Sequence, residues 1–127
     1  MIFLAFHSFA LDLSGLAHPD VTLWAADVDG QVAAIGALKR LDAARGEIKS
    51  MRTHPDFLRR GLAAALLEVI IDHARATGLS VLSLETGSGP VFEPALALYR
   101  RRGFANGAAF ADYQLSDFNQ CLHLPLA

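Results

Sequence analysis

The sequence predicts an α/β (α+β) fold: a mixed, mostly antiparallel sheet with a central parallel strand–helix–strand unit. Asp29-Gly30 lies between two apolar runs and is a strong β-hairpin turn signal. Gly61–Thr77 has the apolar spacing of an amphipathic helix. Leu79–Thr86 is a short apolar run of strand length. A strand, a helix and a strand in succession form a right-handed parallel crossover, so helices cover the sheet.

The first half of the chain is expected to supply the antiparallel strands. Ile2–His7 is expected to be an edge strand, and Phe9–Ala17 a short helix capped by Ser8. The elements that follow are a hairpin of Val21–Val28 and Gln31–Lys39, a turn over Leu41–Gly46 and a third strand over Glu47–His54.

The third strand should present two different faces, because successive side chains of a strand point in opposite directions. Glu47 is thereby grouped with the cation Lys49, two positions along. One face then holds Glu47, Lys49, Met51 and Thr53, and the other Ile48, Ser50 and Arg52.

The second half is expected to supply two helices and the closing strands. The first helix carries an apolar stripe from Leu62 to Ala74, and Gly78 suits the position just after its end. The second helix covers Pro94–Arg102 and stops at Gly103. The remaining strands are Leu79–Thr86, Ala108–Phe110 and Gln120–Leu124.

Composition limits the classes of protein that fit. A chain of 127 residues with 53% apolar and 19% charged residues predicts one domain over residues 1–127 with a real core. A net charge of −2 gives nucleic-acid binding little support. The single cysteine, Cys121, and the lack of zinc-site spacing predict no disulfide, no metal and a reducing, cytoplasmic location. The apolar start lacks a basic segment and is too short to span a bilayer, so we expect no signal peptide and no membrane partner.

Met51–Ala65 combines a strand, a turn containing Arg59-Arg60-Gly61 and the start of a helix. The first N–H groups of a helix have no partner within it, and the helix dipole places positive charge at the same end. This junction therefore predicts a site for a phosphate or pyrophosphate.

Two motifs connect this site to a known family. Leu58–Ala63 fits the frame Gln/Arg-x-x-Gly-x-Gly/Ala, with Leu58 at its first position. Ala95–Phe104 is close to Ala-x-x-Leu-Tyr-x-x-x-Gly-Phe, with Phe92 where an Asn often stands three residues earlier. Through these motifs, from about Val21 onward, the chain resembles the GNAT superfamily of N-acetyltransferases. The resemblance implies a GNAT-like acyl-CoA N-acyltransferase fold, here shortened at the N-terminus.

The resemblance also implies the ligands. Acetyl-CoA is the expected co-substrate, and the expected acceptor is a primary amine of a small molecule or peptide, attacking directly in a ternary complex. The pantetheine arm is expected along Met51, Arg52 and Thr53, pairing with the backbone of Met51 and Thr53 as an added strand. The expected pyrophosphate contacts are Leu58, Arg59, Arg60, Gly61, Leu62, Ala63 and Ala64.

Two residues are implied as catalytic. Tyr99 corresponds to a tyrosine that protonates the departing thiolate; the alternative is a half-buried tyrosine that packs its helix on the sheet. Glu47 aligns with a strand glutamate that serves as base in the histone-modifying branch, often through water. The alternatives for Glu47 are an ion pair with Lys49 and a water chain as the base. Phe110 and Asp112-Tyr113 follow the last turn, where the family places part of its acceptor wall.

Two other functions remain open. Leu58, Phe92 and the short start are compatible with a catalytically inactive acyl-CoA-binding or regulatory module. A nucleotide-binding domain could use the same helix end, but the chain has neither Gly-x-Gly-x-x-Gly nor a P-loop. If Ile2–His7 leaves the Val21–Val28 edge bare, that apolar edge would pair with another chain, so we predict a homodimer.

Overall fold

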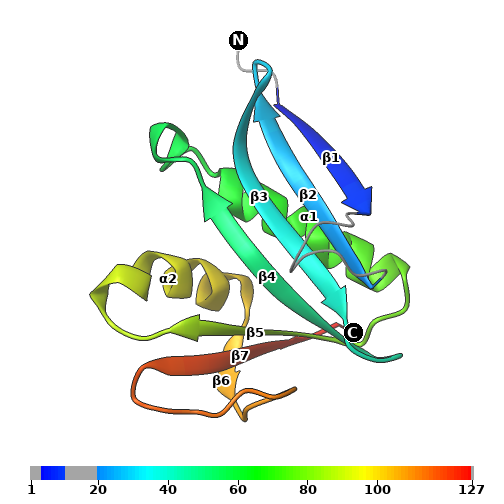
Figure 1. Cartoon of the computed structure of the whole chain (residues 1–127), viewed down its shortest axis with the longest axis vertical. Helices are drawn as coiled ribbons and strands as arrows, with labels where there is room; N and C mark the ends of the chain where they lie inside the picture. The colour runs from blue at the N-terminus through cyan, green and yellow to red at the C-terminus, as the bar shows by residue number, and fades with distance from the viewer. Residues whose placement is uncertain (1–3, 11–19, 127) are drawn as a thin grey trace.

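Seven strands of the described chain form one sheet, in the order β1-β2-β3-β4-β5-β7-β6 (Figure 1). The computed structural model describes residues 4–10 and 20–126. The strands are β1 (Leu4–Ala10), β2 (Val21–Val28), β3 (Gln31–Arg40), β4 (Arg45–Thr53), β5 (Val81–Gly87), β6 (Ala105–Gly107) and β7 (Asn119–Pro125). The helices are α1 (Leu62–Ala76) and α2 (Glu93–Arg102), each preceded by a 3₁₀ turn, η1 (Pro55–Phe57) and η2 (Pro90–Phe92).

The sheet divides between β4 and β5. These neighbours are parallel, whereas the other paired strands are antiparallel. They pair only through Arg45–Glu47 and Val81–Ser83 and then diverge, which opens the sheet like a V in Figure 1. The unpaired edges of β4 and β5 leave backbone groups free at this opening.

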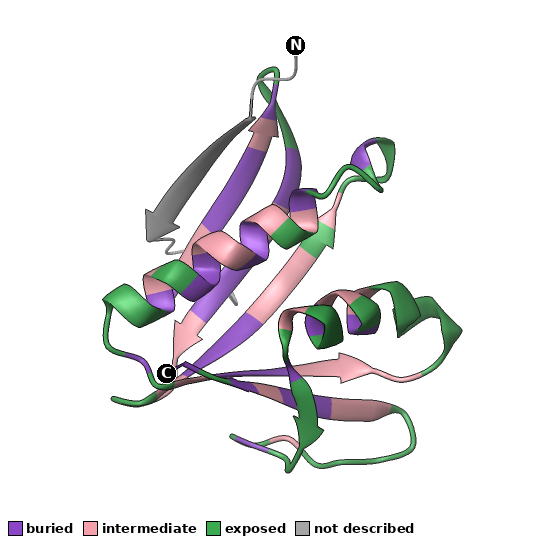
Figure 2. Ribbon diagram, turned by 180° about the vertical axis from the view of Figure 1, so that it is seen from behind, coloured by how far each residue is buried: buried purple, intermediate pink, exposed green. Residues whose placement is uncertain are grey.

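Both helices lie on the same face of the sheet, α1 over β2–β4 and α2 beside β5 (Figure 2). The apolar stripe of α1 is fully buried at Leu66, Leu67, Ile70 and Ile71. Leu96 and Tyr99 of α2 join the same core cluster. The predicted amphipathic helix therefore covers the sheet as expected, because its apolar side chains can leave water only against the strands.

The predicted fold class is confirmed, and so are the central hairpin and parallel crossover. Asp29 and Gly30 both have positive φ (50° and 86°), as a type I′ hairpin turn requires. Gly78, with φ 86°, follows α1 and donates its N–H to the carbonyl of Arg75. Residues with positive φ thus follow strand β2 and helix α1 at the positions that the sequence indicated.

The beginning of the chain differs from the prediction. β1 pairs with β2 from Leu4 opposite Val28 to Ala10 opposite Thr22. It therefore covers the edge of β2, and the reason for expecting a homodimer is removed. The helix expected over residues 9–17 is wrong at Phe9 and Ala10, and its cap Ser8 also lies in β1; residues 11–17 lie outside the described part of the chain.

The strand expected over Ala108–Phe110 is wrong. β6 lies earlier, at Ala105–Gly107. The carbonyl of Ala108 accepts a hydrogen bond from Nε2 of His123 (2.8 Å), and the Phe110 ring packs against the His123 ring (centroids 5.7 Å apart). Side chains of β7 therefore hold this segment against the sheet, and residues 108–110 do not continue the ladder.

The alternation predicted for β4 is interrupted at Ser50. The register with β3 shifts between Ile35 and Ala37, and Ser50 has φ 58°. This β-bulge inserts one extra residue and reverses the faces of the residues after it. Met51 consequently packs against the core, beside Gly36 and Leu66, so it lies on the α1 face and does not share the face of Glu47.

Candidate active site

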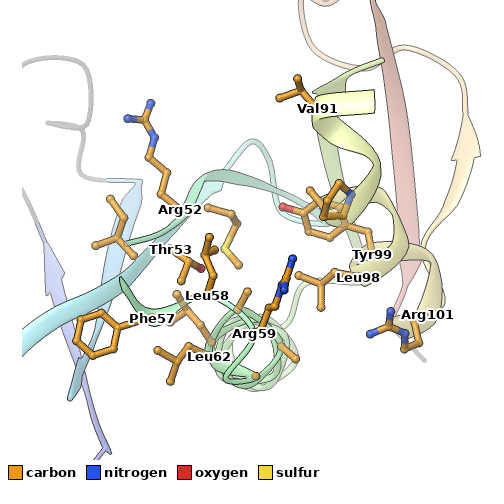
Figure 3. Close-up of a pocket in the computed structure, with 18 residues that line it drawn as sticks. Arg52, Thr53, Phe57, Leu58, Arg59, Leu62, Val91, Leu98, Tyr99 and Arg101 are labelled. Carbon is orange, nitrogen blue, oxygen red and sulfur yellow. The ribbon is translucent and has the colours of Figure 1, made fainter. Parts of the chain in front are cut away.

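A cleft of about 480 Å³ lies where β4 and β5 diverge (Figure 3). One wall comes from the end of β4 and the turn into α1. The other comes from η2 and α2, including Leu98 and Tyr99. The two halves of the split sheet thus each contribute one wall, so the cleft exists only because the strands separate after Glu47.

The turn before α1 lines this cleft. Arg59 and Gly61 both adopt left-handed backbone conformations, with φ 64° and 76°. The first α-helical backbone bond of α1 runs from the N–H of Ala65 to the carbonyl of Gly61 (3.0 Å). The N–H groups of residues 62–64 precede that bond and remain for a ligand, because the capping residue Gly61 has no side chain. This geometry fits a bound anion.

The two predicted cations of the turn are placed differently. Arg59 lines the cleft, and Figure 3 shows its guanidinium reaching in from the turn. The guanidinium of Arg60 lies 5.1 Å from the Phe57 ring centroid, and Arg60 is not among the lining residues. Leu58 lines the cleft with an exposed side chain, so its polar contribution comes from its backbone.

Tyr99 stands on the α2 wall. It is 6% exposed, and its ring packs edge-on against Phe104 (centroids 5.7 Å apart). Figure 3 shows its hydroxyl directed into the cleft. Burial raises the pKa of this phenol to about 12. Tyr99 therefore packs its helix on the core and also directs its hydroxyl into the cleft, so its role as a general acid stays a prediction.

Arg101 also lines the cleft, although it was not among the site residues predicted from the sequence. Its neighbours have structural partners: Arg100 donates to Asn106 (3.1 Å), and Arg102 forms an ion pair with Glu68 of α1. Within the described residues, Arg101 has no hydrogen-bond or ion-pair partner. Its position three residues after Leu98 on one helix face was the signal that could have revealed it.

Glu47 lies on the face of the sheet opposite the helices and is not among the cleft-lining residues. It is 4% exposed. Its Oε2 accepts a short hydrogen bond from the Tyr113 hydroxyl, and its Oε1 lies 4.0 Å from Nζ of Lys49. The predicted ion pair with Lys49 therefore exists at the limit of the distance range, and Tyr113 is the closer partner.

The segment carrying Tyr113 is anchored on this face by a chain of side chains. The Ser83 hydroxyl, fully buried on β5, lies 2.7 Å from Nδ1 of His123, whose Nε2 bonds Ala108. The Phe110 ring contacts both the His123 ring and, at 5.1 Å between centroids, the Tyr113 ring. The Ala108–Tyr113 segment therefore closes over the sheet beside Glu47.

The structure brings most of the predicted site residues together. Tyr99 faces the predicted cofactor residues across the cleft, whereas Glu47 and Arg60 lie elsewhere. The predicted cofactor residues that line the cleft are Met51, Arg52, Thr53, Leu58, Arg59, Gly61, Leu62, Ala63 and Ala64.

A family model described as "Acetyltransferase (GNAT) family" matches residues 4–104. The chain belongs to the GNAT family of acetyltransferases. It is 46% identical to the uncharacterized N-acetyltransferase YedL of Escherichia coli (strain K12), over 94% of this chain and 75% of that protein. It is 49% identical to the uncharacterized N-acetyltransferase YsnE of Bacillus subtilis (strain 168), over 82% and 69%. The GNAT chain described here is accordingly an N-acetyltransferase, an enzyme of the acyltransferase class.

Solved structures show the same GNAT fold. One from Klebsiella pneumoniae superposes with a TM-score of 0.87 at 26% identity, covering 98% of each chain. A GNAT acetyltransferase from Elizabethkingia anophelis, solved with acetyl-CoA bound, has a TM-score of 0.76 at 17% identity, covering 97% of this chain and 98% of that one. Among the described residues of this chain, none of the helices combines the length and apolar character needed to cross a membrane.

Proposed function

We propose that the protein transfers the acetyl group of acetyl-CoA to a primary amine of a small molecule or peptide, by direct attack in a ternary complex. One observation carries the proposal: a helix-end anion site and a buried, protonated tyrosine line the same cleft. A phosphate-bearing thioester needs both features, one to bind its polar end and one to receive its leaving group.

The binding part of the reaction is assigned to the β4–α1 junction. The N–H groups at the start of α1, together with Arg59, suit the pyrophosphate because they combine backbone donors with positive charge. The free edge of β4 at Met51–Thr53 suits the pantetheine amides, which can pair with it as an added strand. Both contacts use backbone groups and do not require a polar side chain at Leu58.

Tyr99 is proposed as the general acid. In the transfer, the amine nitrogen forms a bond to the acetyl carbon, the carbon–sulfur bond breaks, and the sulfur needs a proton. With a pKa of about 12, Tyr99 holds its proton at any working pH. Its hydroxyl also points into the cleft (Figure 3), so it can donate that proton to the departing sulfur.

Glu47 is proposed as the group that receives the proton of the amine, directly or through water. It is the last β4 residue paired with β5, so it stands where the two strands begin to separate. A ligand bound in the cleft on the helix face would therefore come near Glu47, on the other face, at the point where β4 and β5 separate. A water chain alone is the competing assignment, and Glu47→Gln distinguishes them because it removes the basic carboxylate without changing its size.

The test is calorimetric titration with acetyl-CoA, followed by measurement of thiol release with a panel of amines. Saturable micromolar binding with thiol release that depends on an amine supports the proposal. Binding without release from any amine would favour an acyl-CoA-binding or regulatory module. Absence of binding, in protein shown by circular dichroism to be folded, would overturn the assignment of the cleft. We also propose a reducing, cytoplasmic setting, supported by the free, buried thiol of Cys121.

A further inference from the structure

The proposed base, Glu47, has a specific partner that the reaction described above does not use. Glu47 is 4% exposed, and a buried carboxylate is stable only where hydrogen bonds or opposite charges replace water. The Tyr113 hydroxyl provides such a bond to Oε2. Nζ of Lys49, at 4.0 Å from Oε1, is beyond hydrogen-bond length.

Tyr113 is held in place by contacts that do not involve Glu47. Its ring packs on Phe110, which packs on His123, and both nitrogens of the His123 ring are hydrogen-bonded, to Ser83 and Ala108. With Nε2 donating to the Ala108 carbonyl, Nδ1 accepts from the Ser83 hydroxyl. The phenol therefore meets Glu47 in a position fixed by β5, β7 and its own segment.

We propose that Tyr113 is a positioning residue for acetyl transfer, whose hydroxyl holds one oxygen of Glu47 and leaves the other oxygen to accept the proton of the amine. This inference rests on the proposed function, and it adds a role that neither family motif contains. Its direct consequence is that the contribution of Glu47 to turnover should depend on residue 113.

Other titratable groups lie near Glu47. They are Lys39, opposite it in register on β3, Arg45 and Lys49 on its own strand β4, Glu85 on β5 and the Cys121 thiol on β7. Burial, followed by the hydrogen bond to Glu47, raises the pKa of Tyr113, so the phenol remains a donor in alkaline solution. Among the described residues, only Tyr113 donates a side-chain hydrogen bond to the Glu47 carboxylate, and this distinguishes it from the cations.

The expected effect follows from this contact. Without the Tyr113 hydroxyl, Oε2 of Glu47 loses its hydrogen-bond donor, and the carboxylate is no longer held in one orientation toward the amine. Tyr113→Phe should therefore lower kcat only as long as Glu47 is present to be oriented. A merely structural tyrosine would lower activity by the same factor whether residue 47 is Glu or Gln.

The first test measures the pair without using activity. The chain has two tyrosines, so Tyr99→Phe leaves Tyr113 as the only phenol, and tyrosinate absorbance then reports that residue alone. We expect it to ionise well above the ordinary pKa of about 10, and to ionise at lower pH once Glu47→Gln is added. Equal titration curves for the single and double variants, both folded by circular dichroism, would overturn the inference.

The second test compares Tyr113→Phe with Glu47→Gln in an otherwise unchanged chain. Tyr113→Phe keeps the ring on Phe110 and should lower kcat/KM about tenfold at neutral pH, with the loss carried by kcat. In the Glu47→Gln background the same change should have little further effect, because its partner is already gone. The acetyl-CoA dissociation constant should remain unchanged in all three variants.

The outcomes separate the two claims. If the unsubstituted protein binds acetyl-CoA and acetylates an amine, but Tyr113→Phe leaves kcat unchanged, the inference fails and the proposed function stands. Full additivity of the two substitutions would overturn it in the same way. If the unsubstituted protein acetylates no amine, the proposed function fails, and the positioning role fails with it even where the titration shows that the two side chains are coupled.

Discussion

The two faces of the sheet at the β4–β5 opening are built in contrasting ways. On the helix face, one continuous segment, Met51–Ala64, supplies most of the cleft wall, and α2 completes it. On the opposite face, side chains from β4, β5, β7 and the Ala108–Tyr113 segment meet around Glu47. Tyr113 and Glu47 are 66 residues apart in the chain, and Ser83 and His123 are 40 apart.

In the proposed reaction, this contrast separates the binding of acetyl-CoA from the positioning of the base. On the helix face, the groups available to a ligand are backbone N–H groups and the edge of a strand. Any sequence that forms the same turn presents these groups. The opposite face uses specific side chains whose hydrogen bonds depend on one another, so each substitution there leaves a partner unsatisfied. We therefore expect substitutions on the helix face to change ligand affinity or turnover, and those on the opposite face to change stability as well.

The largest effect is expected for Tyr99→Phe, the residue that completes the helix face. The ring keeps its packing on Phe104, so kcat should fall about 100-fold or more while the acetyl-CoA dissociation constant stays unchanged. In the unsubstituted protein, loss of the Tyr99 proton should not reduce activity until the pH approaches about 12. Steady-state kinetics and calorimetry measure both quantities, and unchanged turnover would remove Tyr99 from the reaction.

A smaller effect on the same face should distinguish the two cations of the turn. Arg59→Gln should weaken acetyl-CoA binding about tenfold, because it removes a charge-assisted contact inside the cleft. Arg60→Gln is the matched control: its guanidinium lies over Phe57, so affinity should change by less than about threefold. Equal losses for both variants, measured by calorimetry, would contradict the geometry of the turn.

On the opposite face, Ser83→Ala should reduce the free energy of unfolding by about 1–3 kcal/mol, because it leaves the Nδ1 of His123 without its buried partner. Ser80→Ala is the control, since that exposed hydroxyl makes only a long bond (3.3 Å) to Ala44; the change should be within about 0.5 kcal/mol. Urea denaturation compares the two. Similar stabilities would mean that the Ser83–His123 pair does not anchor the segment.

The smallest effect should come from Arg101, at the open end of the helix face. Arg101→Gln should weaken acetyl-CoA binding by about threefold at low salt, and the difference should shrink as salt increases, because an exposed cation acts mainly through screened charge. Arg100→Gln tests whether position matters, because Arg100 bonds Asn106 away from the cleft. If both substitutions weakened acetyl-CoA binding equally, only the net charge of the protein would affect the binding.

The sequence predicted the helix face more completely than the opposite face. Local patterns predicted three features of this face: the turn before α1, the β4–α1–β5 crossover and the position of Tyr99. Each lies within one segment, whose backbone geometry follows from a glycine, from helix periodicity or from helix capping. The bulge at Ser50 was not foreseeable, because the left-handed conformation (φ 58°) is uncommon for serine and tertiary packing imposes it. It moved Met51 into the core and separated it from the face of Glu47.

By itself, the sequence determined the fold class, the position of the turn before α1 and the tyrosine that faces this turn across the cleft. These features depend on residue spacing within single elements, which the chain carries wherever it folds. Tertiary structure decided the rest: how far β4 and β5 diverge, which of three successive arginines lines the cleft, and which side chain meets Glu47. Those features depend on contacts between residues that are distant in the chain. The packed sheet brings such residues together, and local backbone preference does not.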